Sequence, residues 1–386
     1  MKAACLPLSL CNSYNSVPPD AANPIIRQMQ KDKLEKLATE RGFPCVTISM
    51  NTNRTYPDNQ KDSIELKNLM REAHDHVVNE FGQHEVTNLL EKIDCLDEVI
   101  DLSNNLDSLH IFLSGTTSEI VKSSWPTLKN TVSVAENFVI KPLIKAFNRI
   151  EDYLILLLSQ SDVRLLHAVN DITLGEINSE DFSYDKDLNF LTDQDKSKDG
   201  KQADNRIREF FNQIDKAVVK VHNKTEMNVV VICSDTNWSK LMQVADKPSI
   251  YYGNVSINFN DTENQPIAVH AFKIVSAIQE KGRAKAIQEM KEAAGHGKMI
   301  TDLSHILYAI KAGKGELLII HDDYHQAVKM TGENSFDLVT DVTQPEVIDD
   351  ITSEMAWEVI SKKGRAIFTN QEEFKAIGNI ALKVRY

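Results

Sequence analysis

The segment YLILLLSQSDVRLLHAV, residues 153–169, decides the fold because two apolar runs flank a short polar turn. Such runs around Ser-Gln-Ser-Asp predict two β-strands joined by a tight turn. Further along, MNVVVICS at residues 227–234 predicts a buried strand, and apolar residues spaced from Ile207 to Val221 predict a helix before it. Strand, long loop, helix and strand in this order predict an α/β layer.

The chain before this segment alternates between helical and β-rich stretches. Helices are predicted over residues 25–41 and from Asp62 to Phe81, where apolar residues recur at three- and four-residue spacing. ENFVIKPLIKAF, residues 136–147, is interpreted as a strand end and a linker. Three runs predict strands: PCVTISM (44–50), LHIFLS (109–114) and SEIVKS (118–123).

The last third of the chain also mixes helices and strands. A long amphipathic helix is predicted over residues 266–294, with Pro266 at its start. A shorter helix around Leu303–Ile310 follows, and another ends before Gly364. Strands are predicted at ELLIIHDD (316–323), RAIFT (365–369) and NIALKVRY (379–386). This alternation predicts an α/β/α layered domain.

The predicted fold class is α/β, an α+β multidomain chain. The predicted parts are a flexible tail (1–24), an N-terminal α/β domain (25–146), a middle domain (147–263) with a loop at 171–205, and a C-terminal domain (264–386).

Charge and cysteine content exclude several classes of protein. The net charge of -13 excludes a generally basic nucleic-acid binder, although a local basic face can still bind RNA. Residues 171–199 carry nine acids against three lysines. Five cysteines without a C-x-x-C pair fit neither a disulfide framework nor a zinc ribbon, so a cytoplasmic location is expected. No apolar stretch reaches about 18 residues, so no membrane span is predicted.

Three segments in the expected order carry a resemblance to a known family: residues 44–73, KPLIKAF (141–147) followed by 153–169, and AIFTNQEEFKAIGNIALKVRY (366–386). Together they resemble the bacterial proteins related to archaeo-eukaryotic class-one release factors and Pelota. The resemblance covers roughly residues 25–386, and it implies a ribonuclease H-like middle domain.

The resemblance implies a function for one loop of the middle domain. In true release factors this loop has the sequence Gly-Gly-Gln and enters the peptidyl transferase centre. The matching residues here are Asp199, Gly200, Lys201 and Gln202. Lys201 stands where the second glycine is expected, and a Cβ there blocks the close approach that glycine permits. No catalytic residue is therefore expected. The alternative interpretation is that Asp199–Gln202 form a simple turn before a helix whose N-cap is Asp204 or Asn205.

Basic residues in each part of the chain could contact RNA phosphates. For each residue alone, a solvated helix face is an equally good interpretation. The RNA-binding candidates are Arg54, Lys67, Arg206, Arg208, Lys281, Arg283, Lys285, Lys362, Lys363 and Arg365.

HDDYH, residues 321–325, could hold a metal, but a polar strand-to-loop junction is the commoner explanation. We therefore expect neither a metal nor a cofactor. Asp162 and Asp235, near the ends of predicted strands, are the candidates for a nuclease site, which would need clustered carboxylates and a divalent ion.

The resemblance implies a factor that occupies the ribosomal A site without releasing peptide, in ribosome hibernation, protection or rescue. One alternative is a peptidyl-tRNA hydrolase that uses Gln202, and another is an RNA nuclease. The implied partners are the 70S ribosome and a translational GTPase such as elongation factor Tu. Neither DNA nor a membrane is expected as a partner.

Overall fold

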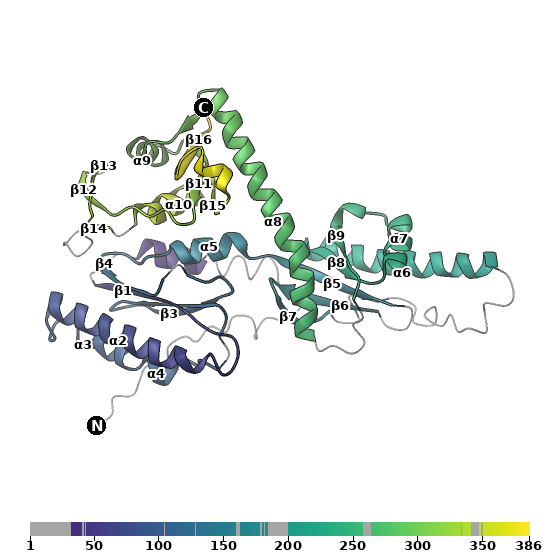
Figure 1. Ribbon diagram of the computed structural model, residues 1–386, viewed down its shortest axis with the longest axis horizontal. Coiled ribbons are helices and arrows are strands. Elements are labelled where there is room, and N and C mark those ends of the chain that lie inside the picture. The colour runs from purple at the N-terminus through teal and green to yellow at the C-terminus, as the bar shows by residue number, and fades with distance from the viewer. Residues whose placement is uncertain are drawn as a thin grey trace. The chain divides into compact units, whose positions relative to one another are not determined.

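The computed structural model describes residues 32–386 except 41, 43, 104, 128, 160–162, 178, 179, 181, 184–199, 258–263, 333, 341–346 and 349. The described residues form two compact units (Figure 1). Unit 1 contains residues 32–149 and 283–386, and unit 2 contains residues 150–282. The N-terminal and C-terminal parts of the predicted three-domain division thus fall mostly in one compact unit. The division itself stays a prediction, and the tail at 1–24 lies outside the described residues.

Unit 2 is built on a five-stranded sheet in the order β7-β6-β5-β8-β9. The predicted hairpin forms its centre, with β6 antiparallel to β5, while β8 runs parallel to β5 and β9 runs parallel to β8. The strands are β5 (Asp152–Leu158), β6 (Val163–Val169), β7 (Ile172–Glu176), β8 (Asn228–Ile232) and β9 (Tyr251–Val255).

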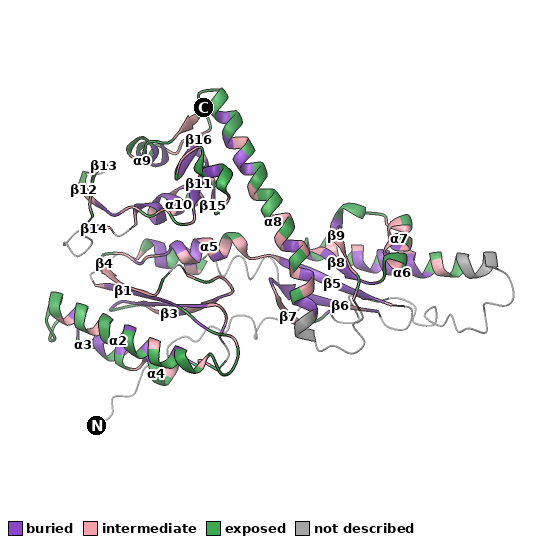
Figure 2. Ribbon diagram, in the orientation of Figure 1, coloured by how far each residue is buried: buried purple, intermediate pink, exposed green. Residues whose placement is uncertain are grey.

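Helices cover both faces of this sheet, which explains why β5 is apolar at nearly every position. Leu154, Leu156 and Leu158 share a core with α6 (Gly200–Thr225) and α7 (Asp235–Val244). The alternate residues, including Ile155 and Leu157, pack with the first part of α8 (Asn264–Gly295). The three inner strands, β6, β5 and β8, are consequently buried along most of their length, whereas the outer strands β7 and β9 are mostly half-buried (Figure 2). This layered α/β arrangement confirms the fold class predicted for the middle of the chain.

The first sheet of unit 1 is antiparallel, in the order β3-β2-β1-β4. Its apolar face packs against helices α2 (Gln60–Phe81), α3 (Thr87–Asp94) and α4 (Leu96–Val99). The strands are β1 (Cys45–Asn51), β2 (Ser108–Leu113), β3 (Ser118–Ser123) and β4 (Thr131–Ala135), so the three predicted strands are confirmed and β4 is an addition.

The second sheet of unit 1 has the order β10-β16-β11-β15. One face packs with α9 (Leu303–Lys311) and α10 (Ile351–Ser361). The other packs with the last part of α8 and with α11 (Glu372–Lys375) through Phe374, so the predicted α/β/α layering is confirmed. The strands are β10 (Met299–Ile300), β16 (Ile380–Val384), β11 (Gly315–His321) and β15 (Arg365–Thr369). A separate small sheet contains β12 (Val328–Gly332), β13 (Ser335–Leu338) and β14 (Val347–Ile348).

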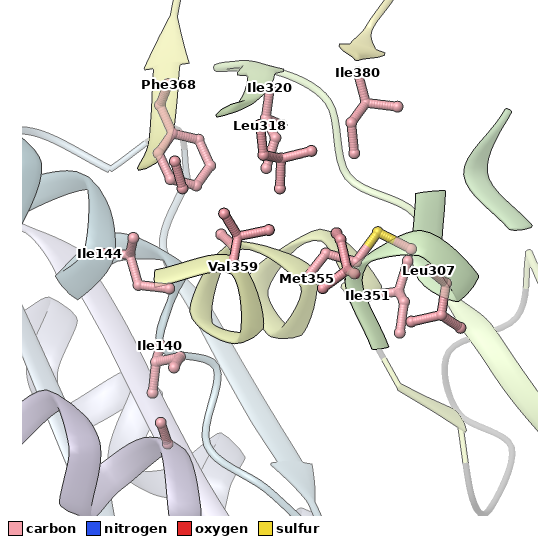
Figure 3. Close-up of a cluster of buried hydrophobic side chains, with 14 of the residues drawn as sticks. Ile140, Ile144, Leu307, Leu318, Ile320, Ile351, Met355, Val359, Phe368 and Ile380 are labelled. Carbon is pink, nitrogen blue, oxygen red and sulfur yellow. The ribbon is translucent and has the colours of Figure 1, made fainter. Parts of the chain in front are cut away.

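The segment interpreted as a linker is in fact helix α5 (Lys141–Arg149), so that prediction is wrong. Pro142 lies in its first turn, where the missing N–H is tolerated, and therefore does not prevent the helix. Ile144 of α5 belongs to one apolar cluster with Met355, Val359 and Phe368 (Figure 3). The same cluster contains Phe112 of the first sheet, so both large sheets of unit 1 share a core.

Two further observations bear on the expected class of protein. Of the described cysteines, Cys45 and Cys233 are buried thiols, whereas Cys95 is disulfide-bonded, so the expectation from the cysteine count that disulfides are absent is wrong. Among the described residues, no helix is long and apolar enough to cross a membrane.

The shared core of unit 1 predicts a large cost for shortening the Ile144 side chain. Ile144 is fully buried, so Ile144→Ala should lower the free energy of unfolding by about 2–5 kcal/mol. Ile64→Ala is the matched control, because that side chain is 65% exposed and should change stability by about 0.5 kcal/mol or less. Urea unfolding followed by circular dichroism measures both, and equal effects would contradict the shared core.

His110 predicts a pH dependence of stability. Its ring is buried between Ser49 Oγ, 2.9 Å from Nδ1, and Ser108 Oγ, 3.0 Å from Nε2. Burial lowers the pKa of His110 from 6.5 to about 4. Between these values the unfolded chain binds a proton that the folded chain does not, so stability falls as pH falls from 6.5 towards 4.

The free energy of unfolding lost by pH 4 is about 3 kcal/mol, from the difference between pKa values of 6.5 and about 4 at roughly 1.36 kcal/mol for each pH unit. We expect His110→Gln to remove this part of the dependence. Urea midpoints of both proteins at pH 7 and pH 5 give the measurement. A pH dependence that is identical in the two proteins would show that His110 is not its source.

Candidate functional site

The residues that match the release loop lie at the start of a helix. Helix α6 begins at Gly200, so Gly200, Lys201 and Gln202 form its first turn, while Asp199 lies outside the described residues. The expectation of a loop at Gly200–Gln202, and of a cap at Asp204 or Asn205, is therefore wrong. Lys201, Gln202 and Ala203 favour helix, which explains the longer α6. A role of these residues at the peptidyl transferase centre stays a prediction.

The outer face of α6 carries a row of cations. Arg208, Lys216, Lys220 and Lys224 are exposed and spaced by eight, four and four residues, and we call them the α6 stripe. Residues four apart on a helix are neighbours about 6 Å apart, so the stripe is continuous from Lys216 to Lys224. Among the described side chains of α6, Glu209 is the exposed acid, whereas Asp215 is buried. The stripe is therefore locally positive in an acidic protein.

Asp215 fixes the orientation of α6 on its sheet. Its carboxylate is fully buried and accepts hydrogen bonds from the Tyr251 hydroxyl (2.7 Å) and the Asp246 backbone N–H (2.8 Å). Burial and this neighbouring carboxylate raise the pKa of Tyr251, so the phenol keeps its proton as a donor. These buried contacts fix which face of α6 packs on the sheet, so the α6 stripe faces solvent.

Several of the predicted RNA-binding cations are held in ion pairs. Arg54 binds both carboxylate oxygens of Asp107, at 2.8 and 2.6 Å. The other pairs are Lys67 with Asp97 (3.6 Å), Arg365 with Glu289 (2.7 Å) and Lys362 with Glu358 (2.7 Å). Pairs of this exposed kind contribute about 0–1 kcal/mol each. They do, however, fix the side chains in place.

Most of the remaining predicted cations are exposed. Lys281 and Lys285 are exposed on α8, and Arg283 between them is half-buried. Arg206 is exposed on α6 beside the stripe, and Lys363 is exposed just after α10. Within unit 1, Arg54 and Lys67 belong to the first sheet and its helices, whereas Lys363 lies beside the second sheet. Within unit 1 the predicted cations therefore belong to different layers of the fold.

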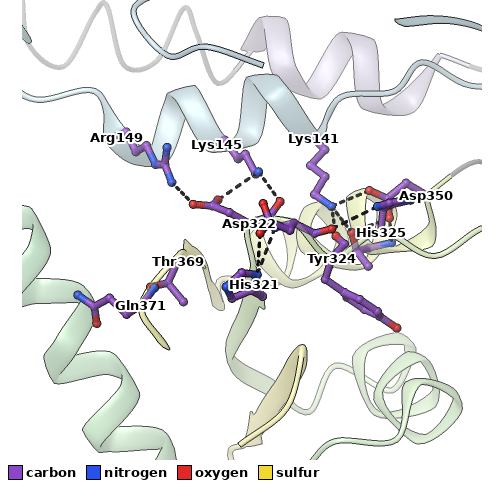
Figure 4. Close-up of polar contacts among 12 residues, drawn as sticks. Lys141, Lys145, Arg149, His321, Asp322, Tyr324, His325, Asp350, Thr369 and Gln371 are labelled. Atoms are coloured by element: carbon purple, nitrogen blue, oxygen red, sulfur yellow. Dashed lines mark hydrogen bonds and ion pairs between the residues drawn. The ribbon is translucent and has the colours of Figure 1, made fainter. Parts of the chain in front are cut away.

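The HDDYH segment (residues 321–325), which begins at the last residue of β11, contacts α5 through the carboxylate of Asp322. Lys145 Nζ lies 3.1 Å from Asp322 Oδ1 and Arg149 Nη2 lies 2.7 Å from Oδ2 (Figure 4). Burial raises the pKa of Asp322, but these two cations outweigh it and hold the pKa below its ordinary value. His321 is buried at the end of β11, and its Nδ1 accepts from the Asp323 backbone N–H (3.3 Å).

Lys141 forms the second anchor of α5. Its buried Nζ donates to Asp350 Oδ2 (2.8 Å), to Thr352 Oγ1 (3.0 Å) and to the Tyr324 carbonyl (Figure 4). Asp350 also caps α10 by accepting from the Thr352 N–H. The sequence carried a signal that we missed, because Lys141, Lys145 and Arg149 recur at four-residue spacing along one helix face.

These contacts give HDDYH a structural role as the docking point of α5. Across the described ranges, no group of three or more His, Cys, Asp or Glu is placed to hold a metal ion. Of the nuclease candidates, Asp162 lies outside the described residues, and Asp235 accepts from Asn254 Nδ2 at the start of α7 (3.0 Å). The chemistry most evident in the described surface is therefore electrostatic, through the α6 stripe.

Comparisons with solved structures found distant similarities. Archaeoglobus fulgidus Pelota is 11% identical, with 92% of each chain covered and a TM-score of 0.36. An archaeal Pelota from a ribosome-bound complex with ABCE1 is 13% identical, covering 92% of this chain and 94% of that one, at 0.38. S. cerevisiae Dom34, a translation termination-like factor, is 14% identical over 72% of this chain and 73% of its own, at 0.33. TM-scores below 0.5 assign no function.

A search of curated proteins found no match. A family model, in contrast, matches residues 152–314, which begin at β5 and include the whole sheet of unit 2, the whole of α8 and helix α9. The matching model is that of the bacterial archaeo-eukaryotic release factor family 3. The resemblance predicted from the sequence is therefore confirmed over residues 152–314, which are similar to the bacterial archaeo-eukaryotic release factor family 3.

Proposed function

We propose that this chain is a ribosome-binding translation factor that occupies the A site without releasing peptide, in ribosome hibernation, protection or rescue. The observation that carries the proposal is the release factor family match over residues 152–314. Helix α6, with its exposed cations, lies inside the matched region. Family and surface therefore point to the same part of the chain.

The α6 stripe supplies the chemistry for contact with ribosomal RNA. Lysines at four-residue spacing place ammonium groups in a row, and RNA presents phosphates as a regularly spaced row of negative charges. Lysine binds phosphate as a flexible point charge and tolerates variation in backbone shape. The net charge of -13 would repel RNA elsewhere, so binding should depend on such local surfaces and fall steeply with salt.

The local sequence and backbone at Gly200–Gln202 support binding without catalysis. A loop that enters a narrow catalytic centre depends on the conformational freedom of consecutive glycines. Here one glycine is followed by Lys201, and all three residues are helical. A glutamine side chain on a helix can still contact RNA, but the backbone geometry of a release loop is missing from this turn. The C-terminal part, residues 264–386, would face a translational GTPase such as elongation factor Tu.

Co-sedimentation with vacant 70S ribosomes tests the binding. We expect the protein to pellet through sucrose at low salt, to be released as salt rises, and to be competed by A-site tRNA. Lys216→Glu/Lys220→Glu should weaken pelleting at least tenfold, because it reverses the centre of the α6 stripe. Lys61→Glu/Lys129→Glu reverses two exposed lysines on unit 1 and should have little effect. Failure of the natural protein to pellet at low salt would end the proposal.

Peptidyl-tRNA hydrolysis on loaded ribosomes tests the absence of catalysis. We expect release at the rate of the buffer control, and Gln202→Ala should change neither this rate nor pelleting. A true release factor added to the same ribosomes controls for their competence. Rapid release that disappears in Gln202→Ala would instead establish a peptidyl-tRNA hydrolase.

A further inference from the structure

A second cationic surface forms where helices α9 and α10 of unit 1 end. It is assembled from the residue before β10, the end of α9, the end of α10 and the residue after β16. We call it the helix-end patch, and it consists of Lys298, Lys311, Lys314, Lys362, Lys363 and Arg385.

Hydrogen bonds tie these segments together. Lys362 Nζ donates to the carbonyls of Ile310 (3.1 Å) and Lys311 (2.8 Å) at the end of α9. Arg385 Nη2 donates to the Lys362 carbonyl (2.8 Å), and the Arg385 backbone N–H donates to the Lys314 carbonyl (3.0 Å). Lys298 Nζ donates to the Arg385 carbonyl at 3.4 Å. The six cations are therefore neighbours in space although they span 88 positions of the sequence, from 298 to 385.

Part of this charge has a structural explanation. Helices end with unpaired carbonyls and a partial negative charge, and Lys362 and Arg385 satisfy such carbonyls. Lys298, Lys314 and Lys363 do not cap a helix in this way. In the described part of the chain, Glu358 is the acid within ion-pair distance of any of the six, at 2.7 Å from Lys362 and 3.6 Å from Lys311. Six cationic side chains against one acidic side chain leave the patch positive.

Lys363 provides a second observation. It follows α10 with a φ of 63°, in the left-handed region where glycine is usually found at a helix end. The backbone N–H groups of Lys363 and Gly364 bond to the carbonyls of Ile360 (3.0 Å) and Val359 (2.8 Å), which fixes this conformation. A Cβ at Gly364 would lie 2.5 Å from a Val359 methyl, so glycine is required there. At Lys363 the chain instead keeps an exposed cation at a conformational cost.

Exposed aromatic rings accompany the cations. Tyr308 on α9 is 61% exposed and lies one turn before Lys311, and Tyr386, next to Arg385, is 76% exposed. Cations that bind phosphates and rings on which bases stack are the two elements of single-stranded RNA recognition. An acidic protein partner would use the cations but has no bases to stack on the rings.

We propose that the helix-end patch binds single-stranded RNA, with its lysines on the phosphates and Tyr308 or Tyr386 stacking on a base. The proposal deepens the proposed function, because it relies on ribosome binding for its physiological RNA. Binding to bare RNA is nevertheless measurable without ribosomes. Absence of RNA binding by the helix-end patch would therefore not contradict ribosome pelleting. Absence of ribosome pelleting would likewise not contradict RNA binding by the patch.

The test is fluorescence anisotropy of a labelled single-stranded RNA at several salt concentrations. All proteins carry Lys216→Glu/Lys220→Glu, so that the remaining binding reports the patch and not the α6 stripe. Lys314→Gln/Lys363→Gln should lower the slope of log affinity against log salt by about 1.4, from roughly 0.7 for each lost phosphate contact. Lys61→Gln/Lys129→Gln removes the same charge from other exposed positions and should leave the slope unchanged.

The aromatic part has its own control. Tyr308→Ala should weaken binding about tenfold with an unchanged salt slope, whereas Tyr56→Ala, at a tyrosine that is 75% exposed elsewhere in unit 1, should not. No RNA binding in the stripe background, or equal losses in the control variants, would overturn the proposal. Equally strong binding of a poly-glutamate peptide would assign the patch to an acidic protein and would also overturn it.

Discussion

The structure of unit 1 depends on the docking of α5 by two acids of the C-terminal part of the chain. Asp350 binds Lys141, and Asp322 binds Lys145 and Arg149. Removing one partner of a buried ion pair commonly costs about 3–5 kcal/mol, because the other charge stays buried without compensation. The aromatic ring of Phe368 lies 5.9 Å from Lys141 Nζ and 5.5 Å from Lys145 Nζ, which adds a cation–π contribution. Through α5, the two large sheets share one core.

The elements predicted most accurately from the sequence are those in which nearly every residue is apolar. The hairpin at 153–169 and the strand at 227–234 are buried on both faces, so nearly every residue in them signals burial. The strand β4 was missed because TVSVA is half-buried and carries a weaker signal. Helix α5 was missed because its segment was interpreted as a strand end and a linker, and because the cations that dock it pair with acids about 200 residues away.

Prediction of the candidate sites was also limited by how far apart their residues lie in the sequence. The α6 stripe lies on one helix, and its spacing is visible in the sequence. Lys362 and Lys363 were identified as neighbours along the chain, but Lys298, Lys314 and Arg385 join them only after folding. Arg365, two residues from Lys363, bonds instead to Glu289. Ion pairing of this kind depends on strand and helix placement, which residue spacing alone does not specify.

Unit 1 is discontinuous in sequence, since residues 150–282 lie between its two parts and form unit 2. A ribosome synthesises the chain from the N-terminus, and domains tend to fold as their residues emerge. The segment up to Arg149 must therefore wait until α9, α10 and β15 have been made before its core is complete. Unit 2, whose sheet lies between residues 152 and 255, can close earlier. During synthesis, α5 thus remains without its acidic partners while the sheet of unit 2 is completed, and its apolar face stays uncovered until the C-terminal part has been made.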